Sequence, residues 1–158
     1  MRSEEEVDLA IERYSDMVRR ICLVHLKNNA DTEDIFQTVF LKYLLYEKEF
    51  ANEEHEKAWF VTVTVNSCKD YLKSFFKKRT VPLEMIADFS DLSDQHQEVL
   101  SAVLSLPPKY KDAIYLHYYE GYTALEISSL LNKKENTIYS LLKRGRDLLK
   151  EMLGGELE

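Results

Sequence analysis

Two clusters of basic side chains are the residues of this sequence best suited to chemistry, and that chemistry is the binding of phosphate groups. The first cluster, within residues 69–79, holds five Lys or Arg against one Asp, a net charge of +4. The second, within residues 133–150, holds six against two acids, again +4. Because the whole chain carries −7, this basicity is local. A local basic surface on an acidic protein favours a directed contact with nucleic acid over general binding.

The first cluster is preceded by aromatic and amide side chains, which would extend it toward unpaired bases. Aromatic faces stack on exposed bases while lysines follow the phosphates. The members that we expect to be exposed are Trp59, Asn66, Lys69 and Lys73. The aromatic residues that we expect in the core instead are Phe60, Tyr71 and Phe75. This segment is therefore a candidate site for single-stranded nucleic acid.

The sequence offers little to an enzyme or a metal ion. Its four His are scattered, and it has no glycine-rich phosphate loop, nucleophile elbow or His-Glu-x-x-His motif. The acids Asp31, Glu33 and Asp34 are better explained as charges at the positive end of a helix than as metal ligands. Cys22 and Cys68 lack the spacing of a zinc site and are expected in the core. We expect a protein that is not an enzyme and needs no cofactor or metal.

Apolar residues recur at helical spacing through the first half of the chain and predict three helices. The first stripe covers residues 5–27 and the second residues 31–44, with Asp31 as the expected N-cap of the second. Residues 60–65 read Phe-Val-Thr-Val-Thr-Val, an alternation typical of a strand. However, a helical face continues through this run, and no second alternating run exists as a partner. We therefore expect a helix over residues 52–78.

A change of charge marks the middle of the chain. Residues 80–92 include a Val-Pro pair, and residues 81–105 carry five acids and no Lys or Arg, which is typical of a linker. Ser93 is expected to cap a short helix after it. Pro108 suits the first turn of the next helix, which we expect to end with Gly121 at its C′ position.

The last part of the chain has the pattern of a helix-turn-helix, from about residue 123 to residue 150. Thr123 and Glu126 have the spacing of a capping box, and Asn132 suits the left-handed residue of a tight turn. Ser128 is small where the two helices are expected to approach each other closely. An ordinary helical hairpin would share these features, but the second helix is basic and polar on its outward face, which favours DNA binding.

Together these elements predict an all-α protein made of two small helical domains joined by a flexible acidic linker, the C-terminal one a helix-turn-helix. The expected domains are residues 1–79 and 93–158, with the linker at 80–92. Only four Gly and three Pro occur among 158 residues, which agrees with long helices. The N-terminus is acidic and no apolar run approaches a membrane span, so we expect a cytoplasmic protein.

Two blocks of sequence carry a family resemblance that covers nearly all of residues 7–153. The first block is Asp31-Thr-Glu-Asp-Ile-Phe-Gln-Thr-Val-Phe-Leu-Lys, followed by Ala58-Trp-Phe, Asn66 and Asp70-Tyr-Leu-Lys. The second is Leu106-Pro-Pro-Lys-Tyr, Tyr118-Tyr-Glu-Gly-Tyr-Thr, Glu126-Ile and Thr137-Ile. With these motifs in this order, the chain resembles the extracytoplasmic-function sigma factors of bacterial RNA polymerase.

The resemblance implies three sets of contacts. The set implied to bind the β′ clamp helices of core polymerase is Asp31, Asp34, Gln37, Phe40 and Leu41. The loop at 47–57 and the following helix would hold the melted −10 strand, with the implied residues Trp59, Asn66, Lys69, Lys73, Lys77, Lys78 and Arg79. The second helix of the helix-turn-helix would enter the major groove of the −35 element, with the implied residues Lys134, Glu135, Asn136, Thr137, Tyr139, Ser140, Lys143, Arg144 and Arg146.

The sequence departs from the family pattern in the same regions. Asn132 stands where the family usually has Gly, Lys133 stands where it has an apolar residue, and residues 137–141 lack two of its usual cations. The loop at 47–57 is rich in Glu, an unusual composition beside DNA: Glu47, Glu49, Glu53, Glu54 and Glu56.

As a member of this family the chain would direct core polymerase, through its β and β′ subunits, to promoters and assist promoter melting. An anti-sigma factor would be a further partner. Two alternatives remain on the sequence alone. One is a stand-alone helix-turn-helix regulator that acts without polymerase. The other is a protein that occupies the polymerase clamp without reading promoters.

Overall fold

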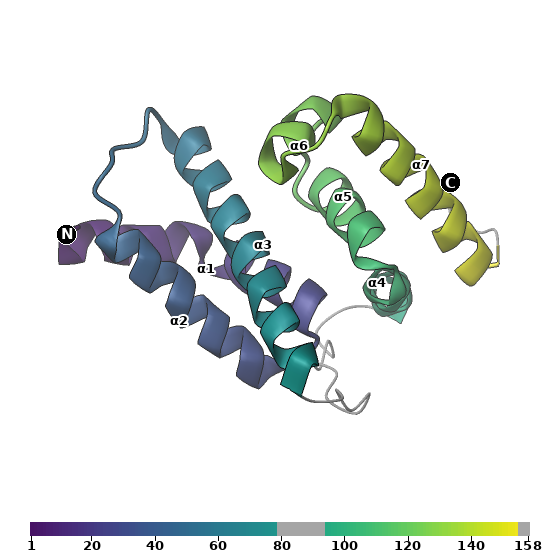
Figure 1. Ribbon diagram of the computed structural model, residues 1–158, viewed down its shortest axis with the longest axis horizontal. Helices are drawn as coiled ribbons and strands as arrows, with labels where there is room; N and C mark the ends of the chain where they lie inside the picture. The colour runs from purple at the N-terminus through teal and green to yellow at the C-terminus, as the bar shows by residue number, and fades with distance from the viewer. Residues whose placement is uncertain (79–93, 155–158) are drawn as a thin grey trace. The chain divides into compact units, whose positions relative to one another are not determined.

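A computed structural model describes residues 1–78 and 94–154, and in those ranges the chain is helical without any strand (Figure 1). The chain divides into two compact units, Met1–Asp88 and Phe89–Glu158. The all-α expectation is confirmed. The expected linker at 80–92, the cap at Ser93 and the basic residue Arg79 lie outside the described residues.

The first unit packs three helices against one another: α1 (Glu4–Leu26), α2 (Asn29–Leu45) and α3 (Glu53–Lys78) (Figure 1). Phe60 of α3 is fully buried at the centre of their interface. Its ring centroid lies 4.7 Å from that of Tyr14 on α1 and 5.2 Å from that of Phe40 on α2. Cys22 and Cys68 are buried free thiols, as expected. The ring of Phe60 on α3 therefore packs against both other helices of this core.

The strand-like run at 60–65 lies inside α3, so the predicted helix is confirmed. Phe60, Thr64 and Cys68, spaced four apart, are all fully buried and form the inward face of the helix. The Thr64 hydroxyl donates to the Phe60 carbonyl at 2.6 Å, which satisfies a buried polar group within the helix itself. Burial of a helical face outweighs the strand preference of the β-branched residues.

The start of α2 differs from the prediction that Asp31 is its N-cap. The cap is Asn28, whose side-chain oxygen accepts from the Asp31 N–H at 2.8 Å while its amide donates to the Asp31 carboxylate at 2.8 Å. Each residue thus satisfies a polar group of the other at the start of α2. Asn28 also donates to the Leu26 carbonyl at 3.1 Å, so it closes the turn between α1 and α2.

The second unit contains α4 (Asp94–Ser105), α5 (Pro108–Tyr118), α6 (Ala124–Leu131) and α7 (Glu135–Met152). Pro108 lies in the first turn of α5, as predicted. The far end of α5 was predicted to place Gly121 at C′, but the C-cap is Tyr119, and Gly121 follows two residues later with a φ of +77°. The chain therefore reverses direction beyond the end of the helix, at the position that tolerates positive φ.

Gly145 of α7 lies tightly against α5. A Cβ atom at Gly145 would lie 2.7 Å from the Cγ1 atom of Ile114 on α5, which is itself buried. The close approach predicted at Ser128 concerns a different pair of helices, α6 and α7. Ser128 is half-buried, and its carbonyl accepts from the backbone N–H groups of Asn132 and Lys133, so it belongs to the turn.

Candidate nucleic-acid interface

The helix-turn-helix is formed by α6 and α7 and is held by local hydrogen bonds. The Thr123 N–H donates to the Glu126 carboxylate at 2.9 Å, and the Glu126 N–H donates to the Thr123 hydroxyl at 3.1 Å. Asn132 adopts the left-handed conformation, with φ 55°, at the end of α6. The predicted capping box and turn are both confirmed, and they fix the path of the chain from α6 into α7.

The outward face of α7 presents polar and basic side chains, while Ile138, Leu142 and Leu149 bury its other face. The predicted −35 residues that are exposed are Lys134, Glu135, Asn136, Thr137, Tyr139, Ser140, Lys143 and Arg144. Arg146 is half-buried, and its Nη1 donates to the Tyr118 hydroxyl at 3.1 Å. The amphipathic division of α7 thus leaves one polar face of the helix available to a groove.

Arg144 also has a partner inside the unit. A hydrogen bond from its guanidinium lowers the pKa of the Tyr110 phenol, and Lys109 lowers it further. Arg144 and Arg146 therefore both tie α7 to the α5 side of the unit. Lys134 and Lys143 are the other two cations of the predicted set, and both side chains are exposed.

In the first unit, the outward face of α3 contains part of the predicted −10 set. Asn66 and Lys73 are exposed and seven residues apart, so they share one face of the helix. Lys69 is half-buried between them and has a partner of its own. Lys77 and Lys78 belong to α3, but their side chains, like that of Phe75, lie outside the described set. Tyr71, expected in the core, is half-buried.

Trp59 is packed more tightly than its predicted exposure implies. It is half-buried, with ring centroids at 5.1 Å from Tyr46, 5.9 Å from Phe50 and 5.0 Å from Phe60. Tyr46 and Phe50 belong to the α2–α3 loop, residues 46–52. The predicted loop at 47–57 is therefore shorter, because α3 begins at Glu53. Trp59 supports this loop as well as offering an aromatic edge beside it.

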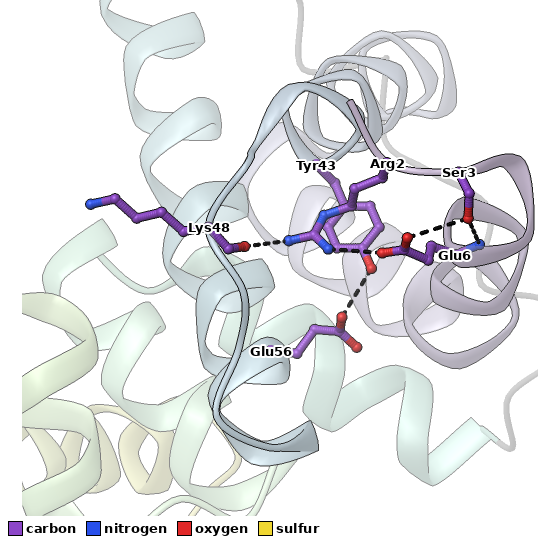
Figure 2. Close-up of polar contacts among 6 residues, drawn as sticks. All are labelled: Arg2, Ser3, Glu6, Tyr43, Lys48 and Glu56. Carbon is purple, nitrogen blue, oxygen red and sulfur yellow. Dashed lines mark hydrogen bonds and ion pairs between the residues drawn. The ribbon is translucent and has the colours of Figure 1, made fainter.

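Arg2 contacts the α2–α3 loop, which was not predicted from the sequence. Its Nη2 donates to the Lys48 carbonyl at 2.7 Å, and its Nη1 donates to the Glu6 carboxylate at 3.1 Å (Figure 2). Figure 2 shows the guanidinium beside the ring of Tyr43, with its carbon 4.5 Å from the ring centroid. The only sequence signal was an Arg within an acidic N-terminus, which does not reveal a partner 46 residues away.

Some acids around the α2–α3 loop are bound within the unit. Arg13 pairs with Glu53 at 3.0 Å, and the Tyr43 hydroxyl donates to Glu56 at 2.9 Å. Burial, and then Glu56, raise the pKa of Tyr43 to about 12, and the same two causes raise the pKa of Tyr14. The remaining acids of the predicted loop are exposed: Glu47, Glu49 and Glu54. Of the five acids of the predicted loop, Glu53 thus has a cationic partner and Glu56 a hydrogen-bond donor within the unit.

The outward face of α2 contains most of the predicted polymerase set. Asp34, Gln37 and Leu41 are exposed. Phe40 is buried, only 7% exposed, so in the free chain it lies beneath this face. Its neighbour in the core is Phe60, because the apolar stripe of α2 turns this side chain inward.

Asp31, also predicted to bind polymerase, is occupied within the unit. Its carboxylate accepts from the Asn28 amide and, at 2.7 Å, from the Tyr71 hydroxyl of α3. Glu33 pairs with Arg19 of α1 at 3.0 Å. Across the part of the chain that the structure describes, no group of three His, Cys, Asp or Glu is placed to hold a metal ion. Nor is any helix there long and apolar enough to cross a membrane.

The sequence matches two family models in chain order. Residues 10–79 match Sigma-70 region 2, and residues 96–149 match Sigma-70, region 4. The chain is 29% identical over 140 residues to the RNA polymerase sigma factor SigV of Bacillus subtilis, covering 87% of this chain and 84% of SigV. It is 27% identical over 154 residues to the ECF RNA polymerase sigma factor SigM of the same organism, covering 92% and 94%.

Solved structures show the same fold. The sigma factor RpoE from Bartonella quintana, crystallised with the anti-sigma factor NepR, superposes with a TM-score of 0.78 at 18% identity, covering 96% of this chain and 99% of that one. CnrH, in complex with the cytosolic domain of CnrY, superposes with a TM-score of 0.68 at 15% identity, covering 98% and 91%.

Proposed function

The chain belongs to the sigma-70 family of RNA polymerase sigma factors, in its extracytoplasmic-function branch, and from that premise we propose how its two units act. Residues 1–79 bind core polymerase and recognise the −10 element. Residues 93–158 recognise the −35 element, and residues 80–92 link the two. The observation that supports this division is the match of regions 2 and 4 to separate parts of the chain, in that order.

The contact with core polymerase uses the outward face of α2. Asp34, Gln37 and Leu41 would contact the β′ clamp helices, because all three are exposed on one helix. Leu41 is 56% exposed, and Leu45, one turn later, is 59% exposed. Exposed leucines beside acidic and amide side chains form the mixed apolar and polar surface that protein partners bury. Phe40 and Asp31 would hold this helix in place from within the unit.

The contact with the −10 element uses the α2–α3 loop and the outward face of α3. Asn66 offers donors and acceptors to a base edge, and Lys73 and its neighbours would follow the phosphates of the melted strand. Trp59 offers an aromatic surface beside the loop. A loop already ordered by ring stacking captures an unpaired base without the entropic cost of ordering itself.

The contact with the −35 element uses α7. The outward face of the first half of α7 is exposed and carries Lys143, with Lys134 exposed at the N-cap, so it suits the major groove, while Arg146 would lie nearer the phosphate backbone. The net charge of −7 makes tight duplex binding by the isolated chain unfavourable, since neutralised phosphates supply most non-specific affinity. Promoter recognition therefore depends on core polymerase holding both units on DNA.

The protein would catalyse nothing itself and would act in the cytoplasm, where its polymerase is. We also propose that an anti-sigma factor controls it. This extends to the chain the partnership of the sigma factor RpoE from Bartonella quintana, which was crystallised with the anti-sigma factor NepR.

Transcription with purified core polymerase tests this function. The template is a pool of genomic fragments, and the transcripts are mapped by sequencing their 5′ ends. We expect defined start sites only when the chain is added, with shared sequence elements near −10 and −35. Absence of any start site, together with no binding of core polymerase, would rule the function out.

A further inference from the structure

Arg2 is bound to three elements at once, and this convergence concerns the α2–α3 loop. Its backbone N–H donates to the Leu44 carbonyl at 2.9 Å, in the last turn of α2. Its side chain bonds to Glu6 of α1 and to the Lys48 carbonyl of the loop, as Figure 2 shows. The end of α2, the start of α1 and the loop therefore meet at Arg2, the first through its backbone and the other two through its guanidinium.

The guanidinium also lies against aromatic rings that form the loop. Its carbon lies 4.5 Å from the Tyr43 ring centroid and 5.0 Å from that of Phe50. Phe50 in turn stacks on Tyr46 at 5.5 Å and contacts Trp59 at 5.9 Å. A planar cation can contact a ring and donate in its own plane to a carbonyl and a carboxylate at the same time. This geometry couples the position of the loop backbone to Arg2.

Burial of the Arg2 guanidinium carries a free-energy cost. The Arg2 side chain is only 10% exposed, and its Nε is buried with no hydrogen-bond partner among the described residues. Desolvation of a charge offsets much of what its ion pair returns, and an unpaired buried donor adds to that cost. The ion pair of Arg2 is therefore weak evidence for a gain in global stability, and the feature that distinguishes Arg2 is its set of contacts with the loop.

We propose that Arg2 is a positioning residue for the −10 interaction. Through the Lys48 carbonyl and the Phe50 ring it holds the α2–α3 loop in the conformation that receives the melted −10 strand. Arg2 itself does not contact DNA. This inference rests on the proposed role of the loop, and it names the residue that shapes that loop.

The position of the loop can be measured without DNA, because Trp59 is the only tryptophan of the chain and packs on Tyr46 and Phe50. The full chain, tagged at its C-terminus, is compared with Arg2→Ala by acrylamide quenching of Trp59 fluorescence. Arg2→Ala should raise quenching. The matched control is Arg19→Ala, which removes an Arg that also pairs with a Glu and lies 4.0 Å from a Phe36 ring, away from the loop. It should leave quenching unchanged.

The functional test uses holoenzyme assembled with saturating core polymerase. The probe is a labelled non-template strand covering the −10 element of a promoter that the wild-type chain has been shown to use. Arg2→Ala should weaken binding of this strand by holoenzyme by about tenfold, because a loop that is no longer held in position must be ordered when the strand binds. A second probe has the preferred −10 base replaced. Arg2→Ala should reduce the ratio of the two affinities, whereas a fall in the folded fraction would leave that ratio unchanged.

Arg2→Lys keeps the charge and the aliphatic stem, so it provides a folded variant if Arg2→Ala fails to fold. Its ammonium cannot replace the planar guanidinium, and the loss of −10 discrimination should persist. The proposal is overturned if both variants keep wild-type discrimination and quenching. It is also overturned if Arg2→Lys restores both. Failure of the wild-type holoenzyme to use any promoter would instead overturn the proposed function.

Discussion

The α2–α3 loop and the helix-turn-helix are built in different ways for related tasks. The loop is held by tertiary contacts, such as that of Arg2 with Lys48, 46 residues away, and the packing of Trp59 of α3 on Phe50. The helix-turn-helix is basic outside and is held by a local capping box at Thr123. A single strand must be received by a shaped surface, whereas a duplex groove accepts a regular helix. The comparison predicts that damage to the first region acts through tertiary packing and damage to the second through local geometry.

The largest effect should follow from Phe60→Ala. Phe60 is fully buried and stacks with Tyr14, Phe40 and Tyr43 at 4.7–5.2 Å. Loss of this ring should lower the free energy of unfolding of the first unit by roughly 3–5 kcal/mol. Urea unfolding followed by Trp59 fluorescence reports on this unit. Hydrogen exchange of α6 and α7 should be unaffected, and a matching loss of their protection would mean that the two units do not respond separately.

The converse change is Gly145→Val in the second unit. A side chain there must displace the buried Ile114 of α5, and such overpacking costs about 1–3 kcal/mol. Hydrogen exchange should accelerate in α5 and α7, and holoenzyme should lose affinity for −35 DNA. The Trp59 unfolding transition should keep its midpoint. Unchanged exchange in α7 would show that the contact between α5 and α7 is not tight.

A smaller effect should follow from Thr123→Ala, which removes one half of the capping box. Loss of an N-cap costs about 1 kcal/mol. Exchange should accelerate in the first turn of α6, and −35 affinity should fall with little change at −10. Thr123→Ser is the matched control, because it keeps the hydroxyl. If Thr123→Ser behaved like Thr123→Ala, the hydroxyl would not be the group that matters.

The smallest effect concerns two tyrosines whose surroundings have opposite charge. Burial and Glu56 raise the pKa of Tyr43 to about 12, whereas Arg144 lowers the pKa of Tyr110. In a spectrophotometric titration, Tyr43→Phe should remove a phenol that ionises near 12, and Tyr110→Phe one that ionises below 10.0. Equal midpoints for the two phenols would contradict this difference.

The raised pKa of Tyr43 also has a consequence for stability. The folded protein holds this proton more tightly than the unfolded chain, whose tyrosines ionise near 10.0. The stabilising contribution is therefore complete below pH 10.0 and is lost as the pH rises toward about 12. Tyr43→Phe should make the alkaline decline of the Trp59 unfolding midpoint less steep.

Local signals in the sequence predicted the helix-turn-helix well. Thr123, Glu126 and Asn132 act on neighbours within a few residues, so their types and spacing reveal their roles. The cap of α2 was misassigned to Asp31 because Asn28 and Asp31 are both good cap residues, and only the backbone distinguishes them. Gly145 gave no local signal, since the reason for it is Ile114 on another helix.

The α2–α3 loop was harder to predict for a related reason. The partner of Arg2 is a backbone carbonyl 46 residues away, and a carbonyl has no sequence signature. Trp59 was expected to be exposed because it begins a polar and basic segment, but Tyr46 and Phe50 cover part of it. The burial of Phe40 followed the same pattern: a motif indicates a functional helix without telling which side chains face outward.

Footprinting of one promoter with the free chain and with holoenzyme tests the central claim most directly. Both are used at the same concentration and salt, with core polymerase alone as the control. We expect protection of the −35 and −10 elements by holoenzyme, protection of neither by the free chain, and opening of the −10 region only in the holoenzyme complex. Strong protection of the −35 element by the free chain, without core polymerase, would contradict it.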